Sequence, residues 1–132
     1  MKALAGDLGI ETAVSFPGRL TTDELSSLLG TAWINLHFSV AEGWCLSVME
    51  AAAAGVPTVA YEVPGISESV VPGTSGLLAK DGDIGDLTNR VTEILHSPQH
   101  WWASSRRVVE SRGWDRVAED WERYLTVVFS SA

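Results

Sequence analysis

Apolar and polar positions along the chain form blocks that predict short strands separated by helices. Continuous apolar runs are typical of strands buried on both faces of a parallel sheet, and they occupy residues 12–16, 32–38, 57–61 and 76–79. Helical spacing or helix start and stop signals mark the residues up to Gly9, 21–30, 45–54, 65–71, 83–96, a segment opening at Ser97-Pro98, and 114–128. This alternation predicts an α/β fold, a Rossmann-like parallel sheet with helices on both faces.

The predicted helix at 45–54 has one charged side chain, Glu50, among leucine, valine, methionine and alanine. A helix that is apolar nearly all round is expected to be buried. A buried carboxylate is costly unless a partner or a pocket compensates for its lost hydration. A second carboxylate, Glu42, precedes the helix. We therefore expect Glu50 to face a binding partner.

The segment "SVAEGWC" (39–45) leaves a strand and enters this helix. It therefore lies at the carboxyl end of the predicted sheet, where such folds bind ligands. Amides at the start of a helix have no intrahelical partner and meet the positive end of the helix dipole, so they form an anion site suited to phosphate. These amides belong to about Gly43, Trp44, Cys45 and Leu46. Gly43 also lets a ligand approach the backbone closely.

The two carboxylates flank this predicted anion site. Glu42 is expected at its rim, and Glu50 lies more than a turn inside the helix. An anion site between two carboxylates suits a molecule with a diphosphate between two polyols, such as a sugar nucleotide. The spacing itself is a loose pattern, and it is equally compatible with two solvated carboxylates that bind nothing.

Composition narrows the class of protein. The 132 residues suit one domain with a real core. A net charge of −8 argues against nucleic acid or an anionic membrane as the main partner, because both require clustered lysine and arginine. The single cysteine, Cys45, excludes an internal disulfide framework and fits a reducing compartment. No apolar stretch approaches the roughly 20 residues of a membrane span, and the N-terminus lacks the pattern of a signal peptide. A cytoplasmic location is therefore expected.

Several motifs occur in the order found in a known family. The segment "EGWCLSVMEAAAAGVPTVAYEVPGISESV" (42–70) resembles the E-x7-E region of the group 1 retaining, nucleotide-sugar-dependent glycosyltransferases of the GT-B fold. The resemblance continues through "GTSGLLAKDGDIGDL" (73–87), and "GWDRVAEDWERYL" (113–125) is similar to the family's closing helix. The resemblance implies a full-length protein with two Rossmann-like halves. Residues 1–132 would then be a single, truncated donor-binding domain, part of an incomplete C-terminal half, with 114–129 as the closing helix.

The resemblance also implies roles for individual residues. Glu42 would contact the hydroxyls of the donor sugar as the catalytic residue, and Glu50 would accept hydrogen bonds from the ribose. Gly18 and Arg19 would lie near the nucleobase through their backbone. The amides expected to hold the sugar and diphosphate are those of Gly43, Trp44, Cys45 and Leu46. Cys45 departs from the family pattern, which commonly has glycine at this position.

The implied activity is transfer of a sugar from a nucleotide diphosphate sugar, with retention of configuration and without a metal or another cofactor. The family's acceptor-binding N-terminal domain, and the first units of its donor half with their basic residues, are not in this sequence. The chain alone is therefore expected to be inactive, with that domain as its missing partner. The alternative is a non-catalytic module for nucleotide-sugar binding or assembly.

One acidic stretch invites a metal interpretation. The segment "DGDIGD" (81–86) begins like a calcium loop. That loop needs glycine at its sixth position and an acid at its twelfth, where this chain has Asp86 and Thr92. Asp83 as the N-cap of the following helix is the favoured interpretation.

The histidines and the cysteine give weaker signals. His96 and His100 are four positions apart, but Pro98 between them disrupts a shared helix, so no metal site is expected there. His37 ends a strand close to the predicted pocket, and a structural role is favoured over contact with the donor. Cys45 has no nearby base in the sequence, which disfavours a nucleophilic role.

Glu68 and the tryptophans complete the candidates. Glu68 is equally compatible with a carboxylate at a helix N-terminus and with a pocket residue. Six tryptophans are many for this length, and four crowd the C-terminal helices: Trp101, Trp102, Trp114 and Trp121. Core packing is the default for them. Because the family's last helix crosses to the other half, part of this aromatic surface is expected to be uncovered here and to promote self-association.

Overall fold

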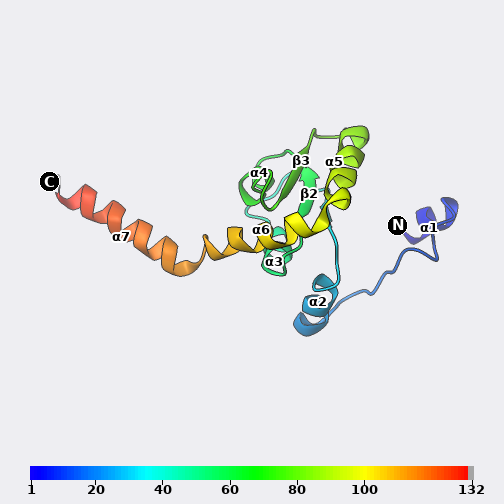
Figure 1. The fold of residues 1–132 in the computed structure, drawn as a ribbon, viewed down its shortest axis with the longest axis horizontal. Coiled ribbons are helices and arrows are strands. Elements are labelled where there is room, and N and C mark those ends of the chain that lie inside the picture. The colour runs from blue at the N-terminus through cyan, green and yellow to red at the C-terminus, as the bar shows by residue number, and fades with distance from the viewer. Residues whose placement is uncertain (131–132) are drawn as a thin grey trace.

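The computed structural model describes residues 1–130, whose strands form one parallel sheet (Figure 1). Within that range the order is β1 (Asn35–His37), β2 (Thr58–Tyr61) and β3 (Gly76–Ala79). Leu36 pairs with Val59, which in turn pairs with Leu77. Parallel neighbours require crossovers, and these contain α3 (Leu46–Ala53) and α4 (Ile66–Ser69). The predicted α/β class is confirmed.

The remaining helices are α1 (Lys2–Asp7), α2 (Thr22–Leu29), α5 (Ile84–His96), α6 (Pro98–Glu110) and α7 (Trp114–Ser130). Two helix starts follow from local chemistry. The Thr21 hydroxyl accepts the Glu24 N–H and the Glu24 carboxylate accepts the Thr21 N–H, which is a capping box. The Asp83 carboxylate accepts the Asp86 N–H at 3.0 Å, so the predicted N-cap of α5 is confirmed.

The core lies on both faces of β2, because successive side chains of a strand point to opposite faces. Ala60 packs in a cluster with residues of α3, α4 and the loops beside them: Cys45, Val48, Val63, Ile66 and Val70. Val59, the neighbour of Ala60, packs instead with residues of β3, α5 and α6: Leu77, Ile94 and Trp101. Helices therefore cover the sheet on two sides, as the sequence predicts.

The predicted strand at 12–16 does not form. Residues 11–13 make a turn, and residues 14–21 are irregular. A short strand needs a paired neighbour and a buried face, and every residue from 10 to 19 is exposed. The segment 32–38 also departs from expectation. Only its centre forms β1, whose Leu36 is exposed, so β1 is an edge strand and is not buried on both faces.

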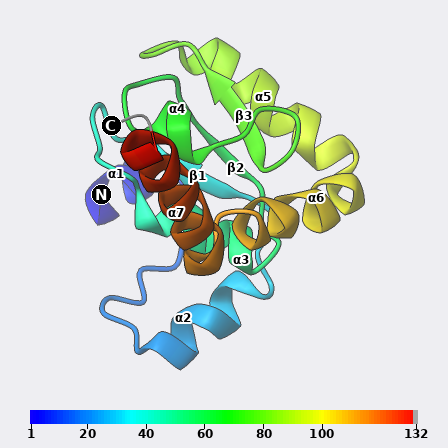
Figure 2. The same cartoon turned by 90° about the vertical axis from the view of Figure 1, so that its left-hand side faces the viewer.

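The two ends of the chain extend away from the sheet in Figure 1. At the N-terminal side, α2 has no buried residue. At the other end, α7 points away from the sheet, as Figure 2 shows from its end. Trp121 and Tyr124 are exposed on α7 and meet edge to face, with ring centroids 5.9 Å apart. The stripe residues Trp114, Leu125 and Val128 lie outside the described side chains.

Candidate functional site

The site is built on the loop that joins β1 to α3, at the carboxyl end of the sheet. Cys45 is the N-cap of α3, with φ 43° and ψ 74°. Within residues 1–130, it is the one residue other than glycine with a positive φ. Four successive amides approaching the helix donate no hydrogen bond to the described part of the chain: those of Gly43, Trp44, Cys45 and Leu46. The predicted set of free amides is therefore present.

Helix α4 packs against this loop. Gly65, at the start of α4, has φ +82°, and a Cβ there would collide with the carbonyl oxygens of Glu42 and Gly43. Only glycine allows this close approach. The Ser69 hydroxyl donates to the Trp44 carbonyl at 2.6 Å and also to the Gly65 carbonyl at 3.1 Å. The loop conformation therefore depends on residues more than twenty positions away.

A second support comes from the junction of α6 and α7. The Arg112 guanidinium lies over the Trp44 ring, 5.2 Å from its centroid. The same guanidinium donates to the Ser69 carbonyl at 3.3 Å. Sequence reasoning missed both Arg112 and Ser69. No local pattern marks them, because their partners lie 68 and 25 positions away along the chain.

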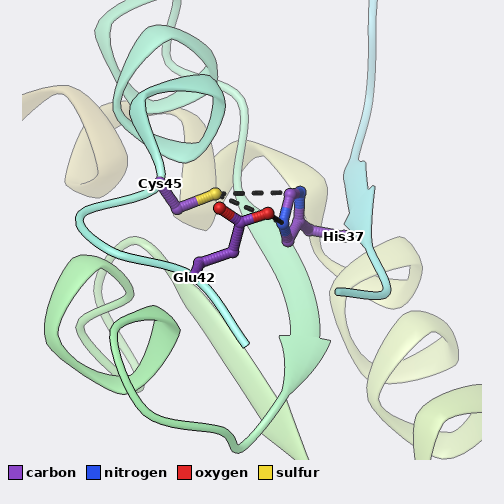
Figure 3. Close-up of side chains that lie close together, drawn as sticks. All are labelled: His37, Glu42 and Cys45. Carbon is purple, nitrogen blue, oxygen red and sulfur yellow. Dashed lines mark hydrogen bonds and ion pairs between the residues drawn. The ribbon is translucent and has the colours of Figure 1, made fainter. Parts of the chain in front are cut away.

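Glu42 points toward the end of β1 (Figure 3). Its Oε1 accepts a hydrogen bond from the Ser39 hydroxyl at 2.7 Å and lies 3.5 Å from His37 Nε2. The Cys45 Sγ lies 3.3 Å from the same histidine nitrogen and 3.4 Å from the Ser47 hydroxyl. The expectation from the sequence that Cys45 has no nearby base is wrong, because the His37 imidazole contacts its thiol. Because β1 ends where α3 begins in space, His37 is adjacent to Cys45.

Glu50 is exposed, and this corrects the expectation that its helix is buried all round. One face of α3 is buried, through Val48, Ala51 and Ala52, whereas Leu46 is 71% exposed. With no strand beside β1 among the described residues, the other face of α3 opens toward α2. Glu50 thus has no burial cost to compensate, and among the described contacts its carboxylate makes no hydrogen bond or ion pair.

The Glu50 side of α3 borders an open cavity of about 460 Å³ between α2 and α3. Its lining includes Glu50 and Arg106, and from α2 it includes Thr22, Leu25, Ser26 and Leu29. Glu42 and the amides of the loop are not part of this lining. Gly18 and Arg19 are exposed in the irregular segment just before α2. The predicted site residues therefore lie in three places. Glu42 and the four amides are on the loop, Glu50 is at the cavity, and Gly18 and Arg19 lie outside the cavity lining.

The weaker candidates have structural roles. Asp86 accepts the Lys80 N–H at 2.9 Å and pairs with Arg90 at 3.3 Å, so the acidic stretch organises the start of α5. His96 lies at the end of α5 and His100 in α6, on separate helices as predicted. Glu68 is in the first turn of α4, as its helix-terminus interpretation requires, and its role toward a ligand stays a prediction.

A parallel sheet with helix amides exposed at its carboxyl edge defines a Rossmann-like ligand-binding unit. A family model described as "Glycosyl transferases group 1" matches residues 1–113, and the chain belongs to this family. The chain is 33% identical over 120 residues to the MMP alpha-(1->4)-mannosyltransferase of Mycolicibacterium hassiacum, covering 87% of this chain and 29% of that protein. It is 35% identical over 92 residues to the D-inositol 3-phosphate glycosyltransferase of Mycolicibacterium smegmatis, covering 70% and 21%.

Solved structures share the fold. Sucrose-phosphate synthase from Thermosynechococcus elongatus superposes with a TM-score of 0.75 at 23% identity, over 99% of this chain and 34% of that one. Anabaena Alr3699/HepE, solved in complex with UDP and glucose, gives a TM-score of 0.75 at 24% identity, over 98% and 35%. The predicted resemblance to GT-B glycosyltransferases is thereby confirmed. The chain spans about a third or less of the length of these proteins.

In the part of the chain that the structure describes, no helix is both long and apolar enough to cross a membrane.

Proposed function

We propose that this chain is part of the donor-binding half of a retaining glycosyltransferase that transfers a sugar from a nucleoside diphosphate sugar to an acceptor hydroxyl. One observation carries the proposal. The start of α3 presents four amides that have no partner among the described residues, beside the Glu42 carboxylate and at the carboxyl end of a parallel sheet. Membership of the group 1 family supports it. The Anabaena protein of the same fold was solved with UDP and glucose, which also supports a sugar nucleotide as the ligand.

The loop supplies binding and electrostatic stabilisation. The amides of Gly43 to Leu46 would hold the sugar and diphosphate. They would stabilise the negative charge that develops on the diphosphate as the anomeric carbon–oxygen bond breaks. The acceptor hydroxyl forms the new bond to that carbon on the same face, and its proton passes to the oxygen of the leaving diphosphate. This route needs no metal ion and no further cofactor.

Glu42 is the residue proposed to act on the donor sugar. Its carboxylate is about one-third exposed, so a sugar hydroxyl can reach it from solvent. The hydrogen bond from Ser39 and the nearby His37 ring hold its Oε1, and no described contact occupies its Oε2. Sugar hydroxyls that donate to this carboxylate would orient the anomeric carbon over the amides, and correct positioning is a large part of catalysis.

Glu50 is proposed to bind the ribose, and the Gly18–Arg19 backbone to lie near the nucleobase. Glu50 borders the cavity between α2 and α3, and Thr22, three positions after Arg19, lines the same cavity. This shared border supports one continuous region for the nucleoside. An exposed carboxylate with open space beside it can accept two ribose hydroxyls without losing a protein partner.

Transfer is proposed for a protein of the relatives' full length, in the cytoplasm, and not for these 132 residues alone. The relatives are about three to four times longer, and we propose that the acceptor site belongs to a further domain. Association of this chain with itself through the exposed aromatic side chains of α7 also remains a proposal.

Calorimetric titration of UDP-glucose and GDP-mannose into the purified chain tests the proposal. We expect saturable binding of at least one donor, weakened at least about tenfold by Glu42→Gln, because a charge-assisted hydrogen bond is lost. Glu110→Gln, an exposed carboxamide substitution on α6, is the matched control and should leave the affinity unchanged. Binding that is equally strong in Glu42→Gln, or absent for both donors, would contradict the proposal.

A further inference from the structure

Three side chains with metal-ligating atoms converge at the end of β1: those of His37, Glu42 and Cys45 (Figure 3). They come from the last residue of the strand, the loop, and the N-cap of α3. One ligating atom from each residue lies within 4.8 Å of the other two. The chain has one cysteine and three histidines in total, so this is the one place where a thiol and an imidazole meet.

Two of the three separations between these atoms match those of a tetrahedral zinc site. Zinc binds cysteine sulfur at about 2.3 Å, and histidine nitrogen or carboxylate oxygen at about 2.0–2.2 Å. At tetrahedral angles these bonds place neighbouring ligand atoms about 3.3–3.7 Å apart. The observed separations are 3.3 Å between Cys45 Sγ and His37 Nε2, and 3.5 Å between that nitrogen and Glu42 Oε1. The third pair, Cys45 Sγ and a Glu42 carboxylate oxygen, lies within 4.8 Å.

The surroundings fit a site with three protein ligands and one open position. Cys45 is 7% exposed, the His37 side chain 18% and the Glu42 side chain 35%, so exposure rises from the thiol toward the carboxylate. The open side leaves room for water or another exchangeable ligand. The Ser39 hydroxyl bonds to the Glu42 carboxylate at 2.7 Å, and such outer contacts orient metal ligands.

The backbone of Cys45 points to the same conclusion. Its φ of 43° lies in the left-handed region, which is strained for a residue with a Cβ. Backbone strain that persists in a fold is commonly associated with a function. In this conformation the thiol lies against the imidazole and inside the core cluster of Val48 and Ile66.

We propose that His37, Glu42 and Cys45 bind one Zn²⁺ ion, with the thiol losing its proton to the solvent on binding. The site goes beyond the proposed transfer reaction, which uses no metal. It has one consequence that rests on the proposed function. Zinc would occupy the Glu42 carboxylate that the donor sugar needs, so zinc and donor would exclude each other.

Direct metal binding by the purified, metal-free chain tests the proposal. Competition with a chromophoric zinc chelator should give one Zn²⁺ per chain. Cys45→Ser and His37→Asn should each weaken binding at least about 100-fold, because even outer contacts of metal sites are worth 10–100-fold. The double variant His96→Asn/His100→Asn removes the other two histidines and should bind zinc like the unaltered chain. Equal affinity in Cys45→Ser, or no zinc uptake, would overturn the proposal.

Cobalt and a glycine variant separate ligation from folding. Co²⁺ bound by the unaltered chain should show a thiolate-to-cobalt charge-transfer band and the intense visible bands of a tetrahedral site. Cys45→Gly should lose that band while still unfolding cooperatively, because relief of the strain at φ 43° offsets part of the packing lost with the buried thiol. A charge-transfer band that persists in Cys45→Gly would overturn the proposal. Because these measurements include no nucleotide sugar, a negative result would rule out the zinc site without bearing on the proposed donor site.

Discussion

The Arg112 guanidinium lies over the Trp44 ring, 5.2 Å from its centroid, and joins the α6–α7 junction to the loop that enters α3. The contact is reinforced by the hydrogen bond from Arg112 to the Ser69 carbonyl, since the Ser69 hydroxyl bonds in turn to the Trp44 carbonyl. One arginine from the C-terminal part of the chain thereby fixes both the ring and, through Ser69, the backbone of Trp44.

This relationship predicts an energetic coupling between the two residues. In a double-mutant cycle of Arg112→Ala and Trp44→Ala, the coupling should be about 0.5–1 kcal/mol, the usual size of a partly exposed cation–π contact. Urea unfolding of the four proteins measures it. Arg123→Ala replaces Arg112→Ala in the control cycle, because Arg123 pairs with Asp120 on α7, and it should give a coupling near zero. Equal couplings in the two cycles would remove the role assigned to Arg112.

A second prediction concerns the contact between Gly65 and the loop. Gly65→Ala should destabilise the chain by more than about 1 kcal/mol, because it adds a collision with the Glu42 and Gly43 carbonyl oxygens to the strain of a positive φ. Gly73→Ala is the matched control, since Gly73 has φ +75° and open space where its Cβ would be. It carries the strain without the collision. Similar unfolding free energies for the two variants would show that the loop does not rest on α4.

Glu50→Gln should separate binding from stability. If Glu50 accepts ribose hydroxyls, the affinity for UDP or GDP should fall about 10- to 150-fold, since charge-assisted hydrogen bonds are lost. The free energy of unfolding should change by less than about 0.5 kcal/mol, because the side chain is exposed and has no described protein partner. Calorimetry and thermal unfolding measure the two effects. A clear fall in melting temperature with unchanged affinity would instead indicate a structural carboxylate.

The capping box predicts a pH dependence at the start of α2. Hydrogen bonds from the Thr21 backbone and hydroxyl hold the pKa of Glu24 below its ordinary value. A lowered folded-state pKa means that this stabilisation is present above the ordinary glutamate pKa and is lost as the pH falls through the folded value. Thr21→Ala should therefore move the titration midpoint of Glu24 upward, as followed by NMR of its side chain. Glu68, in the first turn of α4, serves as the internal reference, and an unmoved Glu24 midpoint would contradict the assignment.

Short-range chemistry made much of the fold predictable from the sequence. The Thr21–Glu24 box and the Asp83 cap each depend on neighbours within a few positions, and both are present. The apolar run at 12–16 misled because a strand also needs a partner edge, which the described residues do not provide.

The candidate site was predictable only in part, for the same reason. The free amides at the start of α3 follow from the position of the helix in the chain. The contacts of Arg112 with Trp44 and of His37 with Cys45 depend instead on how distant segments pack, and no local pattern marks them. The expectation that the helix carrying Glu50 is buried all round was wrong, because helix composition does not reveal whether a neighbouring element covers each face.

Binding of a donor diphosphate by the amides entering α3 can be followed residue by residue, in amide NMR spectra of the isotope-labelled chain during titration with UDP and GDP. For at least one nucleotide, we expect four amide signals to shift together and saturate with one dissociation constant: those of Gly43, Trp44, Cys45 and Leu46. Signals of α5, such as that of Thr88, should stay in place. Saturable shifts confined to other parts of the chain, with these four amides unmoved, would contradict binding at the start of α3.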